Sequence, residues 1–296
     1  MLKQLQKNFP SIIKYNDNVN NVNRNYQWFI TEANEIIGID RNELTKKDTS
    51  ILAAFLTPYD IQFPLPTEHE KTWKNRINNG TQSEVVTPYR FVYFSIKKNQ
   101  TDPKSFKAAL DEFFTKAVPI LWENEHEGVI VEEQTPDTEE SISYEQIIDV
   151  LMSDLYVKIK FLVGPYLDNL KNIDQYYYSF IKSANIAFAY SDKSVITYID
   201  AIAYTLLDQA DVKLRNEITA IVLNEFTADE DVLHTIKTFI ECNLNVSLTA
   251  KELYMHRNSL QYRLDKFIEK TGVDVRQFNQ AMIVYLAILA NMNKSK

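Results

Sequence analysis

Two helical segments of unequal length, separated by a tight turn, lie in the last part of the sequence and limit the fold more than any other feature. The first segment is short, begins with Ser247 as a good N-cap residue, and ends near Leu253. The second runs over Arg257–Thr271 and stops at Gly272, the residue that best adopts the left-handed conformation after a helix. Small Ala250 would let another helix cross closely. This arrangement predicts a helix-turn-helix.

Apolar residues at helical spacing supply the inner face of this motif. In the turn Tyr254–His256 we expect Met255 to point inward. The helical segment before the motif has an apolar stripe of its own, which needs a partner to cover it. This segment starts with the spacing of a capping box, at Thr227–Glu230. The inner residues of the second segment are Leu260, Leu264 and either Phe267 or Ile268, and those of the preceding segment are Leu233, Ile236, Phe239 and Ile240. We therefore predict an all-α domain over residues 227–296.

The outer face of the motif carries side chains of the types that contact DNA. Arg pairs bidentately with guanine, Asn and Gln pair with adenine, and Ser, Tyr and Lys hold phosphate oxygens. A recognition helix enters the major groove with its N-terminus first, so Arg257, Asn258 and Gln261 are expected to read bases. Tyr262, Arg263 and Lys266 are expected to lie toward the DNA backbone. The candidate DNA-binding residues are Ser247, Arg257, Asn258, Ser259, Gln261, Tyr262, Arg263 and Lys266.

Charge is distributed unevenly along the chain. The net charge of −8 argues against nucleic acid as a partner, because phosphate binding needs local positive charge. Residues 231–296, however, hold nine Lys and Arg against six acids, a surplus of +3, so the remainder carries −11. Any solvated helix face is also polar. The residues alone therefore leave open both DNA binding and a protein-interaction module with a degenerate helix-turn-helix.

A family resemblance bears on this choice. The stretch NVSLTAKELYMHRNSLQYRLDKFIEKTGVDV, with the helix before it and the apolar helix Phe278–Leu289 after it, resembles the C-terminal helix-turn-helix of the PucR/CdaR family of bacterial regulators. HRNSLQYRL with its trailing TG carries the match. The resemblance implies DNA binding and usually a dimer. Many members also carry a degenerate GGDEF-like domain upstream, which Val85–Leu207 resembles most clearly in VKIKFLVGPYLDNLKNIDQYYYSFIKSANIAF.

The middle of the chain has the element order β-α-β-β-α-β, typical of a ferredoxin-like sheet with helices on one face. A hairpin is expected around the polar turn NEHE. The strands are predicted at Val85–Ile96, Pro119–Glu123, Gly128–Glu132, Val157–Val163 and Val195–Tyr198, and the helices at Ser105–Ala117, Tyr144–Tyr156 and Ile173–Ser191. We predict a multidomain α+β protein, in which this ferredoxin-like, degenerate GGDEF-like α/β domain spans 81–207 and a connecting helix spans 208–226.

Residues 1–80 are expected to form an N-terminal α+β region of unknown role. Two short strands are predicted around a polar turn at Thr31–Glu35, after an Asn-rich loop at Asn16–Asn25. A helix capped at Asp48 or Thr49 and stopped by Pro58 should follow. The two prolines in Phe63–Thr67 predict an extended segment.

Motifs that would indicate catalysis are missing from the sequence. The first middle strand ends FSIKK without an acid, and the hairpin turn does not contain the GG(D/E)EF signature that an active cyclase needs to hold metal and triphosphate. The four histidines share no metal-ligand spacing, and there is no Gly-rich phosphate loop. We predict no enzymatic activity, no cofactor and no metal.

The start of the chain has no apolar core of a signal peptide, and the longest apolar run is too short to span a bilayer. Cys242, the single cysteine, cannot form an intramolecular disulfide and fits a reducing compartment. We expect a cytoplasmic transcription regulator that does not contact membrane, binds double-stranded DNA as a homodimer, and responds to an effector that the sequence does not identify, if it has one.

Overall fold

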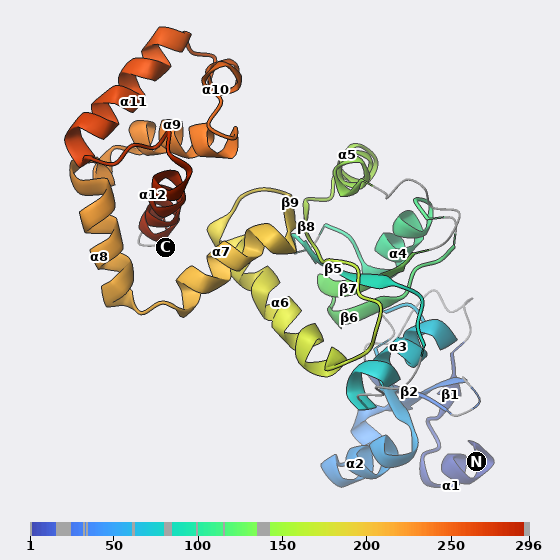
Figure 1. Cartoon of the computed structure of the whole chain (residues 1–296). Helices are drawn as coiled ribbons and strands as arrows, with labels where there is room; N and C mark the ends of the chain where they lie inside the picture. The colour runs from blue at the N-terminus through green and yellow to red at the C-terminus, as the bar shows by residue number, and fades with distance from the viewer. Residues whose placement is uncertain are drawn as a thin grey trace. The chain divides into compact units, whose positions relative to one another are not determined.

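The computed structural model describes residues 2–15, 25–31, 33, 35–60, 63–79, 85–98, 100–114, 116–134 and 143–292 (Figure 1). Their contacts divide the chain into two compact units. The first contains Met1–Pro66 and Thr101–Glu112, and the second contains Thr67–Gln100 and Phe113–Lys296. Segment 101–112 therefore belongs with the N-terminal residues rather than with the sequence on either side of it.

The first unit is built on a four-stranded antiparallel sheet in the order β1-β3-β2-β4. Phe29, Ile37 and Leu52 are central in its small apolar core. The two strands predicted around the turn at Thr31–Glu35 are confirmed as β2 and β3. Its elements are α1 (Leu2–Asn8), β1 (Ile13–Lys14), β2 (Tyr26–Ile30), β3 (Ile36–Asp40), α2 (Lys46–Phe55), β4 (Thr57–Tyr59) and α4 (Pro103–Asp111).

Helix α2 begins earlier than the sequence predicts. Thr45 is its N-cap: the Thr45 hydroxyl accepts the N–H of Asp48 at 3.2 Å, and the Asp48 carboxylate accepts the N–H of Thr45 at 3.0 Å. The predicted cap at Asp48 or Thr49 is wrong because Asp48 is the third residue of a capping box. The helix ends before Pro58, which lies in edge strand β4, where a missing N–H is tolerated. The Asn-rich residues 16–24 lie outside the described residues.

The second unit contains a five-stranded sheet in the order β6-β7-β5-β8-β9. The first four of these strands pair antiparallel, and β9 is parallel to β8. The predicted hairpin is confirmed as β6 and β7, while α3 and α7 were not predicted. The elements are α3 (Glu68–Asn79), β5 (Tyr89–Ile96), β6 (Ile120–Asn124), β7 (Glu127–Glu133), α5 (Tyr144–Leu155), β8 (Ile159–Val163), α6 (Ile173–Tyr190), β9 (Val195–Thr197) and α7 (Tyr198–Gln209).

Helices cover both faces of this sheet, so the prediction of helices on one face is wrong. Phe161 of β8 contacts Tyr144 of α5, with ring centroids 4.9 Å apart. Its neighbour Leu162 points to the opposite face and packs in the cluster formed with α3, α6 and α7. Phe91 of β5 lies on that second face, 6.2 Å from Phe180 of α6. The sheet is buried on both faces because its strands are apolar at successive positions rather than at alternate ones.

The C-terminal part of the second unit is helical. The connecting helix predicted over 208–226 corresponds to α8 (Val212–Leu223). A 3₁₀ turn at Asn224–Ala228 follows, and then come α9 (Glu230–Glu241), α10 (Val246–Glu252), α11 (Arg257–Thr271) and α12 (Phe278–Met292). Asp229 caps α9 by accepting the N–H of Val232 at 3.1 Å. The predicted capping box at Thr227 is wrong because Thr227 belongs to the 3₁₀ turn.

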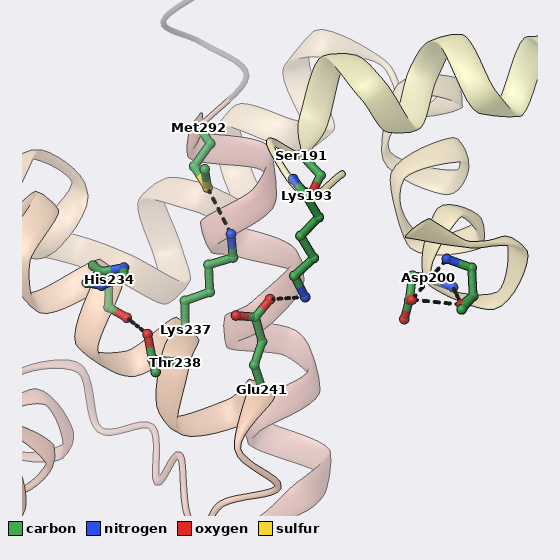
Figure 2. A network of polar contacts seen from close by, with 9 residues as sticks. Ser191, Lys193, Asp200, His234, Lys237, Thr238, Glu241 and Met292 are labelled. Carbon is green, nitrogen blue, oxygen red and sulfur yellow. Dashed lines mark hydrogen bonds and ion pairs between the residues drawn. The ribbon is translucent and has the colours of Figure 1, made fainter. Parts of the chain in front are cut away.

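Helix α12 is shared by two apolar clusters. Val284 and Ile288 pack with α9 and α11, whereas Leu289 and Ala290 pack with α6 and α7. Polar contacts lie beside these clusters (Figure 2): Lys193 forms an ion pair with Glu241 of α9 at 3.3 Å, and the Lys237 ammonium lies 3.9 Å from the Met292 sulfur. Among the described residues, no helix is long and apolar enough to cross a membrane.

Candidate nucleic-acid interface

Asn245, and not Ser247, caps the first helix of the predicted motif. The Asn245 side-chain oxygen accepts the N–H groups of Ser247 and Leu248, each at 3.0 Å. Asn243 and Leu244 have positive φ values of 55° and 59°, so the chain turns there and α10 starts with Val246. The predicted cap at Ser247 is therefore wrong. Ser247 is an exposed residue of the first turn.

The turn between α10 and α11 directs one side chain inward and another outward. The N–H of Met255 donates to the carbonyl of Ala250 at 2.8 Å, and the Met255 side chain packs against the helical core as predicted. Tyr254 has a φ of 50° and is 99% exposed. The ring of His256 caps α11, because its Nδ1 accepts the N–H of Asn258 at 3.2 Å. His256 therefore helps to define where the second helix begins.

Helix α11 has a buried face and a polar face. Leu260, Leu264 and Phe267 are each 0% exposed, which decides the alternative between Phe267 and Ile268 in favour of Phe267. The helix ends at Gly272 in the predicted left-handed conformation, with a φ of 72°. A side chain at Gly272 would meet no atom within 4 Å, so backbone conformation alone favours glycine there.

The predicted DNA-binding residues do not all occupy the same environment. Arg263 is half-buried, and its Nη1 donates to the hydroxyl oxygen of Thr235 on α9 at 2.9 Å. Tyr262 is 69% exposed. The other predicted residues are also exposed: Ser247, Arg257, Asn258, Ser259, Gln261 and Lys266. The structure therefore places seven of the eight candidates at the surface and ties the remaining one to a neighbouring helix.

A groove of about 530 Å³ runs between α11 and the start of α9. It brings together the five predicted residues Asn258, Ser259, Tyr262, Arg263 and Lys266, but neither Arg257 nor Gln261 lines it. Sequence reasoning missed the opposite wall, where the acidic residues Asp229 and Asp231 lie. This wall follows from the cap of α9, since acids are favoured at a helix N-terminus.

Ion pairs neutralise some of the charges on α11. Arg276 pairs with Asp265, and Lys270 lies 3.5 Å from Glu225. Within the described part of the chain, neither Arg257 nor Lys266 forms an ion pair with an acid. Also within that part, no group of three or more His, Cys, Asp or Glu side chains could hold a metal ion. The exposed surface of α11 therefore carries the cations Arg257 and Lys266, without ion pairs among the described residues, together with amides, hydroxyls and the acids Asp265 and Glu269.

Comparisons with known proteins identify this helical region. The model of the PucR C-terminal helix-turn-helix domain matches residues 232–290. The purine catabolism regulatory protein of Bacillus subtilis is 38% identical over 60 residues, which are 20% of this chain and 11% of that protein. The protein YxkF of Bacillus subtilis is 30% identical over 273 residues, covering 89% of this chain and 90% of YxkF. The chain belongs to the PucR/CdaR family of transcription regulators.

Another regulator resembles part of this PucR/CdaR-family chain. The carbohydrate diacid regulator of Escherichia coli is 32% identical over 75 residues, which are 25% of this chain and 20% of the regulator. The matched family domain extends from α9 into α12 and includes every predicted DNA-binding residue. The chain is thus a DNA-binding transcriptional regulator, and its mixed α+β fold ends in the helical region that carries the family's helix-turn-helix.

Proposed function

We propose that α11 is the recognition helix of this regulator and lies in the major groove of operator DNA. The observation that carries the proposal is its division into a buried seam of Leu260, Leu264 and Phe267 and an outward face of exposed polar residues. Arg257, Asn258 and Gln261, near the start of the helix, read base edges. Tyr262 and Lys266, farther along, contact the DNA backbone together with Ser259 and Ser247.

The proposal includes a homodimer. One recognition helix reads too few base pairs to select a site in a genome, whereas two copies related by a two-fold axis read two half-sites about 34 Å apart. A palindromic operator follows from that symmetry. The expected stoichiometry is two chains per operator, which analytical ultracentrifugation of the complex measures directly.

We further propose that the five-stranded sheet belongs to a degenerate GGDEF-like domain without catalytic activity. The strand order β6-β7-β5-β8 supports a ferredoxin-like core, with β6 and β7 as the hairpin. At that hairpin the Glu127 carboxylate accepts hydrogen bonds from Asn124 at 2.7 Å and Ser95 at 3.2 Å, which is a structural use of the acid. Formation of a cyclic dinucleotide from GTP and Mg²⁺ would contradict this part of the proposal.

The regulator is proposed to act in the cytoplasm, without a cofactor and without contacting membrane. Its DNA-binding role is tested by selecting binding sites from a random 30-base-pair duplex library with the full-length chain. Enrichment of a palindromic sequence, bound with an affinity that falls as salt rises, is the expected result. A chain that enriches no sequence and binds a partner protein through the Tyr262 face would instead indicate the protein-interaction module.

A further inference from the structure

We propose that Arg263 is a positioning residue: it fixes the rotation of α11 on α9 through Thr235 and does not bind a DNA phosphate. This inference rests on the proposed role of α11 as the recognition helix. It gives Arg263 a role that differs from the backbone contact expected from the sequence. The exposed cations Arg257 and Lys266 of α11 keep their proposed DNA contacts.

The contact joins the half-buried Arg263 side chain to the buried hydroxyl of Thr235. Thr235 is 1% exposed, although its side chain is polar. Its hydroxyl donates its single proton to the carbonyl of Asp231, one turn earlier in α9, at 2.7 Å. The hydroxyl oxygen therefore presents its lone pairs to the Arg263 Nη1 at 2.9 Å. A hydrogen bond from a charged donor is stronger than a neutral one, and a partner hidden from water strengthens it further.

The position of this contact gives it control over the rotation of α11. Leu260, Leu264 and Phe267 form an apolar seam, and apolar contacts are non-directional, so they permit small rotations of the helix. Arg263 lies beside the seam, on the side that faces α9. A hydrogen bond requires a defined distance and angle, so it holds one rotation. Base readout needs such a constraint, because bidentate pairing of side chains with base edges depends on geometry.

The surroundings of Arg263 disfavour a phosphate ligand. Asp229 and Asp231 line the same groove, so a phosphate placed against the Arg263 guanidinium would lie near two carboxylates. Ser259, Tyr262 and Lys266 also line the groove, but all three are exposed, unlike Arg263, and the long stem of Lys266 allows its ammonium group to reach beyond the groove. The two cations therefore have different roles and form a matched pair for an experiment.

The test compares four variants of the full-length chain: Arg263→Met, Thr235→Val, Thr235→Ser and Lys266→Met. Fluorescence anisotropy measures their affinity for the palindromic duplex selected by the wild-type chain and for a scrambled duplex, at several salt concentrations. Thr235→Val preserves side-chain shape and the Arg263 charge but removes the acceptor oxygen. Thr235→Ser retains that oxygen. Lys266→Met serves as the control for loss of a phosphate contact.

The proposal predicts that Arg263→Met and Thr235→Val each lower the ratio of affinities for the selected and scrambled duplexes at least about fivefold. The slope of log affinity against log salt concentration should stay unchanged in both variants. Combining the two should cause no further loss, and Thr235→Ser should retain the wild-type preference. Lys266→Met should weaken binding to both duplexes and reduce the slope by about 0.9.

A slope lowered by about 0.9 in Arg263→Met, with wild-type preference in Thr235→Val, would overturn the proposal and assign Arg263 to a phosphate. Wild-type preference in both variants would also overturn it. Failure of the wild-type chain to bind DNA would instead refute the proposed function.

Discussion

Replacing Leu264 with alanine is predicted to destabilise the helix-turn-helix by about 3–5 kcal/mol. Leu264 is 0% exposed and packs among residues of α9, α11 and α12. The substitution removes three carbon atoms, and at about 0.8 kcal/mol for each buried group the transfer cost alone is about 2.4 kcal/mol. The cavity left between the three helices adds the rest, because a packed core relaxes only partly around it.

Asp265→Ala is the matched control for this substitution. Asp265 follows Leu264 on the same helix, but its side chain is 63% exposed and pairs with Arg276 at the surface. Exposed ion pairs contribute little, so the expected loss is below about 1 kcal/mol. Urea unfolding followed by far-ultraviolet circular dichroism reports the helices. The three tryptophans lie outside the helix-turn-helix, with Trp28 in β2, Trp73 in α3 and Trp122 in β6, so their fluorescence reports the sheet-containing parts of the chain. Equal losses in the two variants would refute the assignment of Leu264 to the core.

Two further predictions concern helix ends, and a third concerns one buried tyrosine. Asn245→Ala should cost about 1 kcal/mol of unfolding free energy and Ser247→Ala less than about 0.5 kcal/mol, because Asn245 caps α10; the reverse order in urea unfolding would contradict this. Gly272→Ala should cost about 1 kcal/mol and Gly272→Asn less, also in urea, since the position has a positive φ. Burial raises the pKa of Tyr89 to about 12, so the folded chain retains a proton that the unfolded chain loses near pH 10. Stability should therefore fall as the pH rises from about 10 to 12, and Tyr89→Phe should reduce this fall in unfolding experiments; an unchanged pH dependence would contradict the stated cause.

Local sequence patterns were sufficient to predict a helix and its buried face where the helix has one apolar face and clear ends. Leu260 and Leu264 define the inner face of α11, and Gly272 ends it in the structure as in the prediction. The hairpin of β6 and β7 was equally clear, because a polar turn separates two apolar runs. The order of strands and helices along the middle of the chain followed from the alternation of strand and helix patterns in the sequence.

Capping-box spacings explain several errors in predicting where helices begin. Thr67 and Glu70 form reciprocal hydrogen bonds at the start of α3, and Thr197 and Asp200 do the same at α7. Both pairs have the spacing of a capping box, so the signal for these helices was present in the sequence. Thr227 and Glu230 have the same spacing without forming one. Spacing alone does not show whether the first residue of the pair already belongs to another turn, as Thr227 belongs to the 3₁₀ turn.

Long-range contacts explain why the candidate site was only partly predicted. The exposed positions of α11 follow from helical periodicity, so the outward orientation of Asn258 and Tyr262 was accessible to sequence reasoning. The partner of Arg263 was not, because Thr235 is 28 residues away and reaches it only when α9 and α11 pack. The acidic wall of Asp229 and Asp231 likewise depends on where α9 begins relative to α11.

The most direct test of the recognition-helix assignment is the affinity of the double variant Arg257→Ala, Asn258→Ala for the selected palindromic duplex and its scrambled counterpart. Asn216→Ala, at an exposed position of α8, is the control. Loss of two base-reading side chains should reduce the preference for the selected duplex by tenfold or more, since each bidentate contact contributes about 1–3 kcal/mol of discrimination. The control should bind like the wild-type chain. A double variant with wild-type affinity and wild-type preference would contradict the assignment of α11 as the helix that reads DNA.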